Sequence, residues 1–222
     1  MSYIKFANVY LKNSEKNILD DASFNIQKGD VCLIVSEYLS GISNIIATDT
    51  NSFTGVVMVD DKLLNTFNKN DKTEYLKKIA HVHPDNDLIQ NLTVYENICL
   101  ACEKVGRIDK VKYYLNKLGL SKKSDLYPLQ LKSFDVQKVK LAMMLCKSPS
   151  IILYTGIDLL QKNQCINILK VLIGESKKNK TTVIIESKKN ELAKAVNMVV
   201  TIKNGEVKVK RNKKPKKAGD LK

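Results

Sequence analysis

Three short apolar runs, separated by helical patterns, constrain the fold of this chain most. The runs are Val31–Val35, Ile151–Tyr154 and Thr181–Ile185, and turn residues bound them. A continuous apolar run of this length is typical of a strand that is buried on both faces, as the strands of parallel sheets are. Strands that alternate with helices favour right-handed crossover connections. The sequence therefore predicts an α/β fold with a mainly parallel sheet core.

Further elements are predicted on either side of these runs. Residues 3–10, 18–26 and 55–61 have strand character, and residues 198–209 form a hairpin pattern around Lys203, Asn204 and Gly205. The middle of the chain, about residues 93–147, has mostly helical patterns. We expect Thr93 to cap a helix there, with Glu96 three positions on.

Length and composition favour one domain in a reducing compartment. The chain has 222 residues, of which 44% are hydrophobic, which is enough to bury a core. Its five cysteines are scattered among apolar neighbours, so we expect free thiols rather than a disulfide framework. The sequence shows neither an apolar run of membrane-spanning length nor a signal-peptide pattern. We therefore expect a cytoplasmic protein.

One cysteine pair leaves a metal site open as an alternative. Cys99 and Cys102 have the spacing of zinc ligands, and His81 and His83 lie upstream. Two cysteines three positions apart on a helix are more often simply buried. We favour the buried interpretation and predict no metal ligand in the chain.

The positive charge is concentrated at the C-terminal end. The formal net charge is +14, and residues 208–222 hold eight basic residues against Asp220 alone. A segment of this composition is expected to be disordered. It suits either a solvated tail or a contact with anionic lipid or nucleic acid, the last being the less favoured partner.

The segment after Val35 lies where a phosphate-binding loop would be expected, between a strand and a helix start. Such loops have the form G-x-x-x-x-G-K-[ST], in which glycine N–H groups and a lysine hold phosphate and a hydroxyl holds Mg²⁺. Here Ser36 replaces the first glycine and Ile42 replaces the lysine, while Gly41 and Ser43 remain. The segment therefore has the place of a phosphate loop without its cation.

Six short phrases, in this order along the chain, resemble the nucleotide-binding domain of ATP-binding-cassette (ABC) transporters. They are Ile18–Phe24, Lys28–Asp30, Leu92–Ile98, Leu118–Leu120, Ser148–Leu153 and Ile202–Gly205. The resemblance is greatest to the small ATPase subunits of lipoprotein-release, macrolide-export and cell-division type transporters. It implies a P-loop NTPase-like ABC ATPase fold over residues 1–209, with an N-terminal antiparallel β-subdomain and a helical subdomain at about 93–147. Residues 210–222 would then be the basic tail.

The resemblance also implies positions for the family's functional residues. Ile42 would take the place of the phosphate-binding lysine, and Pro84 that of the glutamine that senses Mg²⁺ and the γ-phosphate. Phe134 falls in the signature loop, where the family has a small residue, although Gln137 and Lys138 match the polar residues after it.

Three further positions would carry the hydrolytic chemistry. Thr155 and Gly156 stand where the family has the Mg²⁺-binding aspartate and the general-base glutamate, and Lys188 stands at the position of the γ-phosphate histidine. Asp158 lies two residues past the position of the base and is not a substitute for it. Asn13 would occupy the adenine-stacking position, with Tyr10 as a neighbour.

These replacements favour a non-catalytic, pseudo-ATPase subunit that serves as a structural or regulatory partner of a permease or of an intact ATPase subunit. Gly41 and Ser43 would be vestigial nucleotide-binding residues, no catalytic residue is assigned, and no cofactor is expected beyond weak Mg²⁺-ATP. The protein would lie in the cytoplasm, at the inner face of the membrane when assembled, with Lys208–Lys217 near anionic lipid. Two alternatives stay open: a stand-alone regulatory module that binds nucleic acid or anionic surfaces through its basic tail, and a weakly active ABC ATPase.

Overall fold

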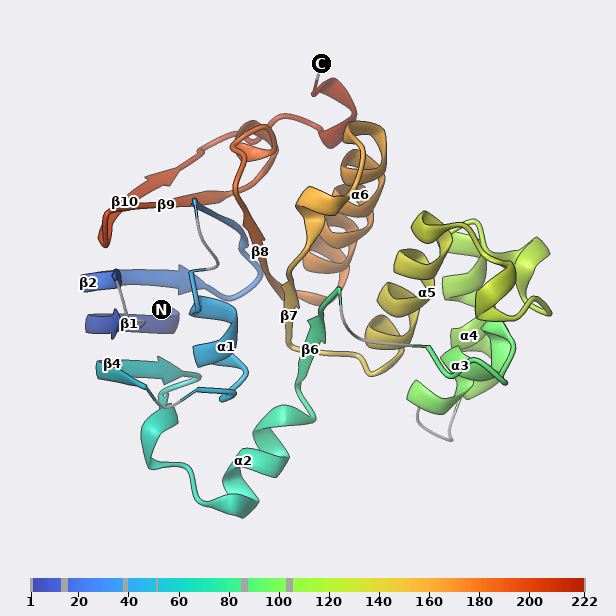
Figure 1. Cartoon of the computed structure of the whole chain (residues 1–222), viewed down its shortest axis with the longest axis horizontal. Coiled ribbons are helices and arrows are strands. Elements are labelled where there is room, and N and C mark those ends of the chain that lie inside the picture. The colour runs from blue at the N-terminus through green and yellow to red at the C-terminus, as the bar shows by residue number, and fades with distance from the viewer. Residues whose placement is uncertain are drawn as a thin grey trace.

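Two β-sheets form the frame of the molecule (Figure 1). The computed structural model describes residues 2–12, 16–37, 40–50, 52–84, 88–102 and 106–221. One sheet is antiparallel, with strand order β2-β1-β4-β5, and the other has the order β10-β9-β3-β8-β7-β6. The strands are β1 (Ser2–Lys12), β2 (Asn17–Gln27), β3 (Val31–Ser36), β4 (Phe53–Val59), β5 (Lys62–Leu63), β6 (Ile79–Val82), β7 (Ile151–Tyr154), β8 (Thr182–Ser187), β9 (Met198–Lys203) and β10 (Glu206–Arg211).

The larger sheet is parallel from β9 to β6, and only β10 joins it in the antiparallel sense. Its central strands are buried on both faces, as the continuous apolar runs predict. Along β3, Val31 and Leu33 belong to one hydrophobic cluster and Cys32 and Ile34 to another, because successive side chains of a strand point to opposite faces. The predicted α/β fold class with a parallel core is confirmed.

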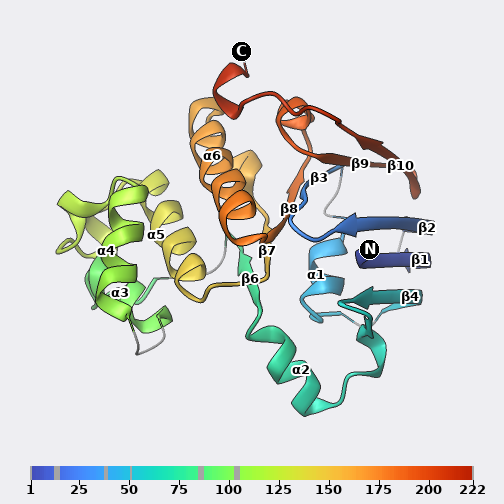
Figure 2. The ribbon, with the colours of Figure 1, turned by 180° about the vertical axis from the view of Figure 1, so that it is seen from behind.

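The helices separate into layers on the two faces of this sheet (Figures 1 and 2). Helix α1 lies between the two sheets, whereas α5 and α6 cover the opposite face. Helices α3 and α4 lie against α5 at the end of the molecule away from the antiparallel sheet. The bounds are α1 (Ile42–Ile46), α2 (Lys69–Leu76), α3 (Val94–Ala101), α4 (Arg107–Lys117), α5 (Ser133–Cys146) and α6 (Lys162–Asn179). Among the described residues, no helix is both long enough and apolar enough to cross a membrane.

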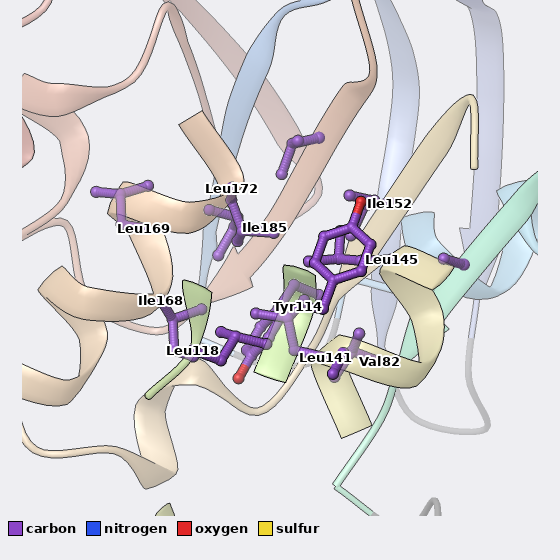
Figure 3. Close-up of a cluster of buried hydrophobic side chains, with 14 of the residues drawn as sticks. Val82, Tyr114, Leu118, Leu141, Leu145, Ile152, Ile168, Leu169, Leu172 and Ile185 are labelled. Carbon is purple, nitrogen blue, oxygen red and sulfur yellow. The ribbon is translucent and has the colours of Figure 1, made fainter. Parts of the chain in front are cut away.

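One hydrophobic cluster joins the sheet to the helical end of the molecule. Figure 3 shows Tyr114 of α4 and Leu145 of α5 beside Ile152 of β7, with Leu169 and Leu172 of α6 nearby. All of these side chains are buried. The cluster fixes the helical lobe formed by α3, α4 and α5 to the sheet.

Two local predictions are confirmed in detail. The Thr93 hydroxyl accepts from the Glu96 N–H, and the Glu96 carboxylate accepts from the Thr93 N–H at 2.8 Å, which makes the capping box of α3. Asn204 and Gly205 both have positive φ, as a two-residue hairpin turn of the favoured type requires, and they join β9 to β10.

The C-terminal segment differs from the expected disordered tail. Residues up to Arg211 belong to β10, and the Asn212 side chain donates to the carbonyl groups of Ala193 and Val196 at 2.7 and 2.8 Å. The Lys216 N–H donates to the Lys194 carbonyl, and Ala218 is buried against α6. Composition alone missed these contacts because they join the segment to residues that are distant from it in the sequence.

Candidate functional site

The candidate site begins where β3 ends and α1 starts. Gly41 is the N-cap of α1 and has φ +70°. A Cβ at this position would lie 2.5 Å from Cδ2 of Leu11, so both the backbone conformation and the space require glycine. The loop residues Tyr38 and Leu39 lie outside the described residues.

A carboxylate from β8 binds the N–H groups of this loop. Glu186 Oε1 accepts from the Ser43 N–H at 2.7 Å, and its Oε2 accepts from the Ser40 N–H at 3.2 Å. Glu186 follows Ile185 on β8 and therefore points to the same face as Ile184, toward α1. Because Gly41 has no side chain to cap the helix, this carboxylate takes the part of an N-cap and complements the positive end of the helix.

The two residues that follow Gly41 are turned into the protein interior. Ile42, at the position of the lysine, is 0% exposed and belongs to the cluster between the two sheets. The Ser43 hydroxyl is buried and has no hydrogen-bond partner among the described residues. Of the predicted pair, then, Gly41 supplies the turn, and Ser43 contributes its N–H to Glu186.

The positions of Pro84 and Gly156 are in direct contact. Gly156 has φ +81°, and a Cβ there would lie 2.3 Å from Cγ of Pro84. The Pro84 carbonyl accepts from the ammonium of Lys140, a buried lysine of α5, at 2.6 Å. No side chain fits at residue 156 while Pro84 stays in place.

The neighbouring polar groups are engaged in structural hydrogen bonds. The N–H and hydroxyl of Thr155 donate to the Val82 carbonyl at 3.0 and 3.3 Å. The Asp158 carboxylate accepts from the Ser187 hydroxyl at 2.6 Å and from the Lys188 N–H at 2.7 Å. Asp158 therefore ties the end of β8 to the turn after β7, while the Lys188 side chain is exposed.

The segment that resembles the signature loop starts α5. Lys132 is the N-cap without a side-chain hydrogen bond, and Phe134 packs partly buried against the helical lobe with the Lys138 ammonium 4.9 Å from its ring centre. Lys123 and Lys138 both pair with Asp135. Burial acts to raise the pKa of Asp135, but hydrogen bonds from these lysines hold it below its usual value. The segment is thus a bulky, charge-paired helix start.

The expected adenine side of the site is described only in part. Asn13 lies outside the described residues, and Tyr10 lies partly exposed on β1. The negative charge of Asp21 raises the pKa of the Tyr10 phenol. Its role in stacking stays a prediction.

The four residues of the alternative zinc site belong to two different elements of the fold. His81 and His83 lie at the end of β6, with ring centres 5.6 Å apart, whereas Cys99 and Cys102 lie at the end of α3. In the part of the chain that the structure describes, no group of three or more potential metal ligands converges. Burial raises the pKa of Cys102, which favours its neutral thiol.

Sequence analysis missed Glu186 and Lys140, which are both buried charged residues. One signal was available for Glu186, because it stands at the carboxyl end of a buried strand, where ligands of parallel sheets bind. Lys140 gave no such signal, since a lysine inside a helical pattern is normally solvated.

Proteins with related sequences are ATP-binding proteins of transporters. Methionine import ATP-binding protein MetN 1 of Enterococcus faecalis is 28% identical over 206 residues, which cover 87% of this chain and 57% of the relative. Glutamine transport ATP-binding protein GlnQ of Bacillus subtilis is 26% identical over 92% of this chain and 88% of its own length. Macrolide export ATP-binding/permease protein MacB of Mannheimia succiniciproducens is 28% identical over 92% of this chain, but only 33% of MacB is covered. The chain therefore spans a part of some relatives and most of others. No protein-family model matches it.

Solved structures with the same fold are ATP-binding cassettes. CbiO1 of Clostridium perfringens, part of the ABC transporter complex CbiONQ, has a TM-score of 0.84 at 19% identity, covering 95% of this chain and 88% of that one. A dimeric cassette in a post-hydrolysis state with ADP and Pi has a TM-score of 0.80 at 24% identity, covering 94% and 98%. In sequence and in fold, this chain is therefore related to the ATP-binding cassettes of ABC transporters.

Proposed function

We propose that this chain is a non-catalytic ATP-binding-cassette subunit that docks to a permease or to an intact ATPase subunit and does not itself hydrolyse ATP. One observation carries the proposal: the Glu186 carboxylate accepts the N–H groups of Ser40 and Ser43, in the loop where the family binds phosphate. The protein's own anion thus occupies donors that a nucleotide would need.

The residues of this loop do not fit a Mg²⁺-triphosphate. Glu186 is only 6% exposed, so a phosphate that displaced it would leave a buried carboxylate without its hydrogen bonds. Ile42 offers no positive charge to compensate either anion. We therefore expect weak nucleotide binding, or none that can be measured at millimolar nucleotide.

Hydrolysis would meet further obstacles at the neighbouring positions. Phosphoryl transfer depends on positioning and charge compensation, and removing one such group commonly lowers the rate by about 10²–10³. Residues 155 and 156 carry no carboxylate, and Pro84 occupies the space that a side chain at residue 156 would need. The proposed subunit would therefore act by binding its partners and not by hydrolysing ATP.

The proposed partners follow from the relatives. MacB carries both an ATP-binding and a permease function in its name, and the solved cassette with ADP and Pi is a dimer. We propose that this chain takes the place of one cassette beside a permease at the cytosolic membrane face. The alternatives are a weakly active ATPase and a separate module that binds nucleic acid.

A nucleotide titration tests the proposal directly. Calorimetry with Mg²⁺-ATP would compare the unmodified chain, Ile42→Lys, and Ile42→Lys with Glu186→Val. We expect no gain from Ile42→Lys alone, because Glu186 still holds the loop, and a clear gain in the double variant. Ile42→Met with Glu186→Val is the matched control, since it opens the loop without adding a cation. Micromolar Mg²⁺-ATP affinity or nucleotide-dependent phosphate release by the unmodified chain would overturn the proposal.

A second experiment tests the partner. The tagged full chain would be purified from its native cells in mild detergent, and its companions identified by mass spectrometry. A permease or an intact ATPase subunit in stoichiometric amount is expected. A stable monomer without any transporter component, or one that retains only nucleic acid, would contradict the proposed role.

A further inference from the structure

A hollow rich in lysine lies away from the nucleotide loop, between the β2–β3 turn, the C-terminal half of α6 and the segment that leads to Ala218. Its volume is ≈ 670 Å³. Six lysines line it, contributed by these three parts of the chain: Lys28, Lys170, Lys177, Lys180, Lys216 and Lys217.

Backbone and hydroxyl hydrogen bonds hold the walls of this hollow together. The Ser176 hydroxyl of α6 donates to the Gly29 carbonyl at 2.6 Å, and the Gly29 N–H donates to the Thr182 hydroxyl at 3.0 Å. The Lys216 N–H is bound to the Lys194 carbonyl at 2.8 Å, and Ala218 packs against α6. The lysines are therefore carried by fixed backbone, although their side chains are exposed.

The described residues that line this hollow include no aspartate or glutamate. None of the six lysines makes an ion pair with a described residue. Two nearby acids are engaged elsewhere, because Asp30 pairs with Arg211 and Glu175 pairs with Lys117. A third, Asp220, lines the neighbouring cavity together with Lys216. A concave surface of one sign focuses its electrostatic field and concentrates counterions.

We infer that this hollow binds a compact polyphosphate group, either as a free molecule or as the headgroup of a phosphorylated lipid. Its volume falls within the range of about 300–1,000 Å³ that is typical of small-molecule sites, which favours a compact ligand over an extended nucleic acid. Several lysines line it, and an ammonium group can make a charge-assisted hydrogen bond to a phosphate oxygen. The site is independent of the nucleotide loop, so it does not rest on the proposed function.

Calorimetry with inorganic tripolyphosphate on the full chain tests the inference. The test variant is Lys170→Glu with Lys177→Glu, two exposed positions that lie two turns apart on α6. The matched control is Lys112→Glu with Lys122→Glu, which makes the same change of net charge on the helical lobe. We expect saturable 1:1 binding that the test variant weakens by roughly tenfold to a hundredfold, with less than about a twofold change in the control.

A second arm separates the two sources of phosphate. Flotation with phosphatidylcholine vesicles that contain phosphatidylinositol bisphosphate would be compared with vesicles that contain phosphatidylserine. Binding to the bisphosphate vesicles that is lost in the test variant indicates the lipid headgroup, and tripolyphosphate binding without vesicle binding indicates a free ligand.

Three results would overturn the inference: no saturable binding of either probe, equal weakening in the test and control variants, or binding of a single-stranded DNA only, unaffected by the test substitutions. Should the test variant fail to fold, Lys216→Ala with Lys217→Ala addresses the opposite wall by the same measurements.

Discussion

Pro84 fills the space that a side chain at Gly156 would occupy, since a Cβ at residue 156 would lie 2.3 Å from Cγ of Pro84. The contact joins the end of β6 to the turn after β7. Lys140 holds the same segment through the Pro84 carbonyl. The two positions are therefore coupled, because a side chain at residue 156 requires a change at Pro84.

The first prediction concerns this contact. Gly156→Ala should destabilise the protein by about 2–4 kcal/mol, because it adds a clash to a backbone with positive φ. Urea unfolding followed by circular dichroism would measure the loss.

Two variants isolate the clash. Gly119→Ala has a similar positive φ with no atom within 4 Å of the added Cβ, so it should cost only roughly 1 kcal/mol. Pro84→Ala with Gly156→Ala should recover part of the loss. If Gly156→Ala and Gly119→Ala lower the free energy of unfolding by the same amount, the clash with Pro84 does not contribute to the loss of stability.

The second prediction concerns Glu186 as the cap of α1. Glu186→Gln replaces one of two acceptor oxygens by an amide that faces an N–H donor, so it should cost about 1–3 kcal/mol. Glu191→Gln, at an exposed position after β8, is the control and should change the unfolding midpoint little. Equal effects of both substitutions would show that the loop does not depend on the carboxylate.

Features encoded by neighbouring residues could be predicted from the sequence, whereas features that join distant strands could not. The capping box of Thr93 and Glu96 and the turn at Asn204 and Gly205 lie within a few residues, and both were predicted correctly. The helix at 69–76 was missed because it has no buried residue and hence no apolar period.

Glu186 shows the limit for the candidate site. Its partners Ser40 and Ser43 are more than 140 residues away and meet it only because β8 pairs with β3. Gly156 and Pro84 meet in the same way, through the pairing of β6 with β7. The resemblance to the family indicated which sequence positions form the site. The contacts that these residues make depend on the order of the strands in the sheet, which the sequence did not reveal.

The third prediction concerns the link between α4 and α6. Glu175 is 2% exposed and accepts from Lys117 and from the Asn179 side chain, the latter at 2.7 Å. Burial acts to lower the pKa of Lys117, but the bond to Glu175 raises it above its usual value. Glu175→Gln should cost about 2–4 kcal/mol, because Lys117 loses its counter-charge.

Hydrogen exchange gives the readout for this link, since faster exchange is expected in α4 than in the sheet. The double variant Lys117→Met with Glu175→Leu should cost less than the sum of the two single changes. Each single change leaves the other charge without its partner, whereas the double variant removes both charges. Strict additivity would contradict a direct interaction.

The fourth prediction is a pH dependence from His81 on β6. Burial lowers the pKa of His81, and the nearby His83 adds to this effect, whereas Asp49 and Glu186 act in the opposite sense. The pKa in the folded state is therefore below the value of about 6.5 in the unfolded chain. As the pH falls below about 6.5, His81 binds a proton in the unfolded chain before it does so in the folded protein. The free energy of unfolding therefore decreases on acidification. Urea midpoints at about pH 7.5 and about pH 5.5 should differ less in His81→Asn than in the unmodified protein. An equal difference in both proteins would exclude His81 as the source. Carboxylates such as Asp135, whose pKa is lowered, stay ionised in both states at these two pH values and do not contribute to the difference.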